Sequence, residues 1–160
     1  MQLRTFIALV ALGTAFASRA EAQTATQTVT FQVSAINQVA VTGSPSLTVN
    51  TATAGSAPTA ATATGSWAVT TNQTGAKITG SIASAMPDGV TLTANLTAPA
   101  GGATSAGAVS LGIVATDLVT GITKLNASAL ALTYGLAATA AAGVVASDTR
   151  VVTFTVTGGT

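Results

Sequence analysis

Hydrophobic and polar residues alternate with a period of two along most of this chain. The alternation is most regular in residues 28–35, 90–97, 130–136 and 152–157, where threonine or another small residue separates Val, Leu, Phe or Tyr. Successive side chains of a β-strand point to opposite faces, and β-branched residues suit a pleated surface. Each run therefore predicts a strand with one buried face and one outward face.

Weaker alternation predicts further strands at residues 39–41, 47–49, 67–71, 77–82 and 109–114. Turn sequences separate the runs at intervals of roughly a dozen residues. The clearest is Met86–Gly89, where Pro87 presets φ and Gly89 accepts a positive φ. The Ala-rich residues 137–142, closed by Gly143, predict a single helical turn. Eight or nine short strands with regular turns predict an all-β chain, folded as a single antiparallel β-sandwich.

The first 22 residues have the pattern of a secretory signal peptide. Arg4 supplies the positive start, a short apolar stretch follows, and small residues suited to cleavage end it. The apolar stretch is too short to span a bilayer. We expect cleavage after Ala22, with cleavage after Ala17 as the alternative. Residues 1–22 are then the signal peptide and 23–160 the β-sandwich domain, located in the periplasm, outside the cell or on its surface.

The composition excludes several classes of chemistry. Only 6% of residues are charged, and the chain has no cysteine and no histidine, which excludes His-based triads, thiol catalysis, zinc fingers and haem or iron–sulfur ligation. Three cations and three anions balance after residue 22, so no basic face is available for nucleic acid. No apolar run after residue 22 is long enough for a membrane span. We therefore expect no enzyme, cofactor, metal or nucleic-acid partner, and the sequence identifies no small-molecule substrate.

The remaining charged residues predict structural roles. Asp88 lies in a turn, where aspartate bonds to its own backbone. Asp148 and Arg150 are two residues apart and are expected to pair weakly on one face of a strand. Asp117 and Lys124 are expected to flank a turn around residues 120–121.

The two ends of the domain carry similar segments. One presents Val29, Phe31 and Val33 on a single face, and the other presents Val152, Phe154 and Val156. They are either the first and last strands of one sandwich, or the N-terminal strand of one molecule fills a groove in another by strand addition. Neither segment contains Lys or Pro, which normally prevent edge pairing. The sequence therefore predicts self-association through edge strands.

The C-terminal part of the chain resembles bacterial fimbrial (pilin) subunits. The resemblance rests on residues 132–137 (LTYGLA), 142–146 (AGVVA) and 150–156 (RVVTFTV), together with the signal peptide and the alternating N-terminal segment. It implies an incomplete immunoglobulin-like sandwich that the N-terminal extension of the next subunit completes. By this resemblance the donor residues are Val29, Phe31 and Val33, and the acceptor edge is lined by Val152, Phe154 and Val156.

These observations predict a secreted structural subunit of a surface fibre, coat or extracellular matrix, which assembles through β-strand addition. The alternative is a secreted adhesin or carbohydrate-binding β-sandwich module. That alternative requires a concave site or an exposed aromatic platform, for which Trp67 and Tyr134 are the candidates. An enzyme ranks third, because the usual components of a catalytic site are missing.

Overall fold

A computed structural model describes residues 21–160. The predicted signal peptide, apart from its last two residues, lies outside the described residues. The chain divides into two units, of which the first ends at Gln32 and the second spans Val33–Thr160. Residues 21–36 contain no strand, and their side chains are exposed. The strand predicted over 28–35 is thus not formed within the described chain, because an extended segment becomes a strand only when another strand accepts its backbone hydrogen bonds.

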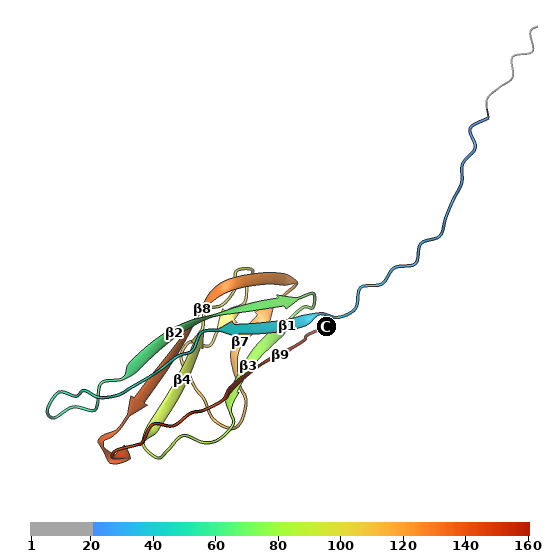
Figure 1. The fold of residues 1–160 in the computed structure, drawn as a ribbon. Coiled ribbons are helices and arrows are strands. Elements are labelled where there is room, and N and C mark those ends of the chain that lie inside the picture. Colours follow the sequence, from blue (N-terminus) through green and yellow to red (C-terminus); the bar gives the residue numbers. More distant parts are fainter. Residues whose placement is uncertain (1–20) are drawn as a thin grey trace, which may run out of the picture. The chain divides into compact units, whose positions relative to one another are not determined.

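The second unit consists of two antiparallel sheets (Figure 1). The five-stranded sheet has the order β1-β2-β8-β4-β6 and the four-stranded sheet the order β5-β7-β3-β9. The strands are β1 Asn37–Thr42, β2 Ala61–Thr71, β3 Ala76–Ile82, β4 Val90–Leu96, β5 Thr104–Ser105, β6 Val109–Ser110, β7 Thr116–Ile122, β8 Leu125–Ala138 and β9 Val152–Thr157. The predicted all-β antiparallel sandwich is confirmed.

Most of the predicted strands after residue 36 are present. The strong runs form β4, β8 and β9, and the weaker ones form β1, β3 and the second half of β2. Residues 47–49 pair with no strand, and only the first two residues of the run 109–114 pair, as β6. Beyond β6, Leu111 is buried and its amide donates to the Leu92 carbonyl at 2.9 Å, whereas Leu47 and Val49 are half-buried without a strand partner.

The turn predicted around residues 120–121 is wrong. Both residues lie inside β7, where Gly121 has a φ of 73°, and the chain reverses farther on, at Thr123 and Lys124. Adjacent Leu118 and Val119 are both buried, so β7 lacks strict alternation. The register of its pairing with β3 shifts twice, which explains how both side chains reach the core.

Two local predictions are correct in kind but displaced. The turn predicted at Met86–Gly89 lies one residue farther on, since the Val90 amide donates to the Pro87 carbonyl at 3.0 Å, and Gly89 has a φ of 76°. The helical turn predicted over residues 137–142 is a 3-10 turn at Ala140–Ala142 only, because residues 137–138 belong to β8, and Gly143 follows it with a positive φ.

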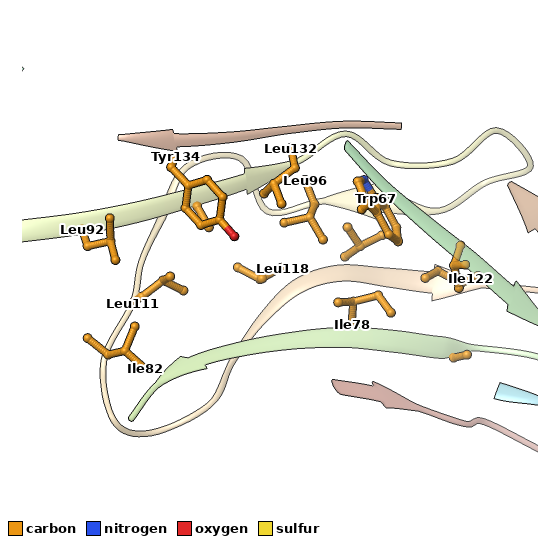
Figure 2. Packing of buried hydrophobic residues seen from close by; sticks show 14 residues of the cluster. Trp67, Ile78, Ile82, Leu92, Leu96, Leu111, Leu118, Ile122, Leu132 and Tyr134 are labelled. Carbon is orange, nitrogen blue, oxygen red and sulfur yellow. The ribbon is translucent and has the colours of Figure 1, made fainter. Parts of the chain in front are cut away.

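The core lies between the two sheets and is built from Val, Leu and Ile around one tryptophan. Trp67 on β2 is 1% exposed and packs among leucine and isoleucine side chains from both sheets (Figure 2). Complete burial of each large apolar side chain contributes about 1.5–3 kcal/mol, so this layer holds the sheets together without disulfides. The Trp67 Nε1 atom is buried and has no hydrogen-bond partner among the described residues.

The end of the described chain is fastened to the turn between β2 and β3. Thr160 and Thr74 exchange two backbone hydrogen bonds, at 2.9 and 3.1 Å. Gly159 leaves no room for a Cβ, which would lie 1.6 Å from the Thr74 carbonyl oxygen. The last residues are therefore part of the folded domain. Within residues 21–160, no helix has the length and hydropathy that a membrane crossing requires.

Candidate functional site: an open groove between two unpaired segments

Two extended segments of the sandwich belong to neither sheet. One follows β1 and includes residues 44–50, and the other precedes β9 and includes residues 144–150 (Figure 1). Within the described chain, no backbone hydrogen bond joins either segment to a strand. Both segments line the same groove, which has a volume of about 970 Å³. The two rims of this groove therefore carry peptide groups that are free to bond to an added strand.

The floor of the groove is apolar. It is formed by Val90, Leu92 and Leu136 from β4 and β8, together with Met86 from the loop before β4. On one rim, Leu47 and Val49 are half-buried, whereas their neighbours are exposed. This alternation matches that of a strand, so the rim offers every second side chain to whatever occupies the groove.

Tyr134 joins the groove lining to β9. Its ring meets the Phe154 ring of β9 edge to face, with centroids 6.5 Å apart. β9 also contacts β1.

Tyr134 is the most buried polar side chain of the groove lining, with 7% of its surface exposed. In Figure 2 its hydroxyl points into the space between the sheets. Burial raises the pKa of Tyr134 above its ordinary value of 10.0, so the group is a neutral hydroxyl at physiological pH. It can donate one hydrogen bond and accept another.

Arg150 fastens the second rim to the domain. Its Nε donates to the Ala85 carbonyl at 3.1 Å, and its Nη1 donates to the Asp148 carboxylate. This hydrogen bond from Arg150 is the main cause that lowers the pKa of Asp148. The expected pairing of Asp148 with Arg150 is present, although the two residues lie on the unpaired rim and not on a strand.

The N-terminal residues of the predicted assembly site are exposed. Val29, Phe31 and Val33 are 73%, 88% and 78% exposed. Isolated apolar side chains are common on surfaces, but here three of them share one side of an extended segment. Such a segment presents an apolar face without a partner in its own sheet.

The C-terminal residues of the predicted site lie on β9. Val152, Phe154 and Val156 are half-buried and pack against the core. β9 pairs with β3 along one side only, and its other side has no partner strand in the described chain. The structure therefore joins Phe154 to the groove lining through Tyr134, and residues 144–150 lead directly into the segment before β9.

Asn72 fixes the point at which the N-terminal segment leaves the sandwich. Its Oδ1 accepts from the Ile36 amide and its Nδ2 donates to the Ser34 carbonyl, both at 2.8 Å. Its own amide donates to the Ile36 carbonyl at 3.3 Å. This clip lies beside the start of β1, whereas the groove begins after the end of β1.

The other candidate residues form no site. Lys77 and Asp117 make an exposed ion pair at 2.9 Å across β3 and β7, and Asp88 remains in its turn. Trp67 and Tyr134 are buried, so neither forms an exposed aromatic platform. Among residues 21–160, no group of three potential metal ligands is present.

Sequence reasoning missed the groove, the Tyr134 hydroxyl and the Asn72 clip. The alternation at Leu47 and Val49 is a signal for the first rim, but the lack of a partner strand cannot be detected from a local pattern. Comparison with known proteins gives no match to a family model, a curated protein or a solved structure.

Proposed function

We propose that this protein is a secreted structural subunit of a surface fibre, coat or matrix, and that its copies join by β-strand addition. The N-terminal segment of one copy, with Val29, Phe31 and Val33 facing inward, fills the groove of the next. The observation that carries the proposal is the groove itself: two extended rims without backbone partners over an apolar floor. The resemblance to fimbrial subunits agrees with this mode of assembly.

The dimensions of the groove suit one strand. Each rim, residues 44–50 and residues 144–150, spans about 20 Å at 3.3 Å per residue. Residues 27–33 span the same length when extended. A strand of this length between the rims forms backbone hydrogen bonds with one or both of them, and each bond contributes about 0.5–1.5 kcal/mol net.

Side-chain burial supplies the remaining affinity. The three inward apolar side chains of the added strand change from exposed to buried, and each contributes about 1.5–3 kcal/mol before ordering costs. Few charges oppose this approach, because Arg150 on the second rim is paired with Asp148.

The alternative, an adhesin or carbohydrate-binding module, has less support. The volume of the groove does lie within the range of about 300–1,000 Å³ that is typical of small-molecule sites. The lining, however, offers no exposed aromatic ring on which a sugar could stack, since Tyr134 is buried.

Truncation tests the proposal. The chain that begins at Gln23 is compared with a chain that begins at Ser34, which keeps the Asn72 clip and all nine strands. We expect the longer chain to form oligomers or fibres in sedimentation velocity and electron microscopy, and the truncated chain to remain monomeric.

A synthetic peptide of residues 23–33 provides the second arm. Added to the truncated chain, it is expected to form a one-to-one complex and no fibre, since each groove is then filled but no copy donates. A peptide with Val29, Phe31 and Val33 replaced by Ser is the matched control. The proposal fails if the chain from Gln23 stays monomeric at high concentration, or if truncation leaves its assembly unchanged.

A further inference from the structure

Two opposite charges of the sandwich have no partner inside one copy. The chain after residue 22 has three cations and three anions. Four of these six side chains form two ion pairs within the fold. The other two, Lys124 and Asp88, are exposed and make no ion pair within the described chain. They are therefore available to a second molecule.

The two residues lie at opposite ends of the domain. Lys124 directly precedes β8. The Asp88 turn lies beside the residue that follows β8, since the Thr139 amide donates to the Gly89 carbonyl at 2.8 Å. The 14 residues of β8 span roughly 40 Å when extended. Lys124 and Asp88 therefore cannot pair within one copy, but they can pair between copies that follow one another.

Lys124 lies at the base of the proposed donor segment. Lys124, Asn72 and Ile36 line one hollow of the surface. The Asn72 clip also holds Ser34, which directly follows Val33. A copy that inserts Val33 into a neighbour's groove therefore brings its own Lys124 end close to that neighbour.

Asp88 lies next to the acceptor groove. Met86 and Pro87, which precede it in the chain, line the groove. Another anion of the groove lining, Asp148, is already paired with Arg150. Among residues 33–160, Asp88 is thus the unpaired anion beside the groove.

From these positions, we propose that Lys124 of the donor copy pairs with Asp88 of the acceptor copy, and that this pair orients successive domains in the assembly. The inference rests on the proposed strand addition. An exposed ion pair adds little affinity, whereas complementary charges speed association and select one orientation. The donor domain then lies at the Asp88 end of the acceptor, because at the opposite end the acceptor's own Lys124 would repel it.

Reversal of each charge in the chain from Gln23 tests the pair by sedimentation velocity. Lys124→Glu and Asp88→Lys are each expected to weaken self-association about 2- to 30-fold at low ionic strength, because each places like charges opposite one another. The variant with both changes has opposite charges at the contact again and is expected to associate as the wild type does. Its contacts with wild-type copies are expected to be as weak as those of the single variants. Lys77→Glu, the same reversal on β3, is the matched control and is expected to have little effect.

The outcomes separate this inference from the proposed function. If the wild-type chain does not associate, strand addition fails and the orienting pair fails with it. If it associates but both reversals behave like Lys77→Glu, or the double variant stays as weak as the single ones, strand addition stands and the pair is refuted.

Salt provides an independent readout. High salt screens exposed charges, so it is expected to remove the difference between the wild type and the single variants. A difference that persists at high salt contradicts a direct ion pair. Circular dichroism melting of each monomer checks that the variants fold, as expected for changes at two exposed positions.

Discussion

Replacing Phe31 by alanine separates assembly between copies from packing within one copy. Phe31 is 88% exposed, so the single domain loses no core contact when the ring is removed. In the proposed strand addition the ring fills the groove of the neighbouring copy. Burial of a phenylalanine contributes about 1.5–3 kcal/mol, so its loss corresponds to about a 10- to 150-fold weaker association.

Two measurements on the same variant distinguish assembly between copies from packing within one copy. Sedimentation velocity over a concentration series yields the association constant, and circular dichroism yields the melting temperature of the monomer at low concentration. We expect Phe31→Ala to weaken association and to leave monomer melting unchanged. Gln32→Ala, on the other face of the segment, is the control and should leave both unchanged.

The reasoning is refuted by the reverse result. If Phe31 packs into its own domain, its removal costs stability, and the monomer melts lower by about 2–4 °C per kcal/mol lost. A Phe31→Ala variant that melts several degrees lower, or that associates as tightly as the wild type, would show that the ring does not act between copies.

Two further predictions concern the clip and the tyrosine. Asn72→Ala removes the side-chain hydrogen bonds to Ser34 and Ile36, each of which contributes about 0.5–1.5 kcal/mol. Hydrogen exchange at the Ile36 amide should therefore become faster. Asn126→Ala, at an exposed position, is the control and should leave this exchange rate unchanged. Because burial raises the pKa of Tyr134 above 10.0, the folded state retains its proton where the unfolded state has lost it. Stability is thus fully present below pH 10 and decreases as the pH rises through the folded-state pKa. Urea unfolding at pH 8 and pH 11 should show this decrease in the wild type and a smaller one in Tyr134→Phe.

The architecture was largely predictable because each strand carries its own local signal. Alternating Thr and aliphatic residues mark β4, β8 and β9 without reference to any partner. β7 was not predicted from alternation, because Leu118 and Val119 are both buried and Gly121 has a positive φ inside the strand. A strand that departs from strict alternation is recognisable only once its partner and its register shifts are known.

The position of the groove was not predictable from the sequence. The sequence indicated exposed edges, and β9 does have a free edge. It did not show that residues 47–49, which alternate like a strand, would lack a partner, because pairing depends on which segment the fold brings alongside. Nor did it distinguish Tyr134 from the other core residues of β8, since a place in the groove lining depends on the fold around it.

The positions of the clip and the groove limit the kind of assembly that strand addition can produce. Asn72 holds Ser34 and Ile36 beside the start of β1, while the groove begins after the end of β1 and opens farther along the domain. In the proposed strand addition, the donor segment and the acceptor groove are different parts of the chain, so the contact between copies is heterologous. A heterologous contact closes into a ring only when its rotation allows, and otherwise continues as an open filament. Since Ser34 directly follows Val33 and is held by the clip, the proposal predicts that successive domains follow one another closely.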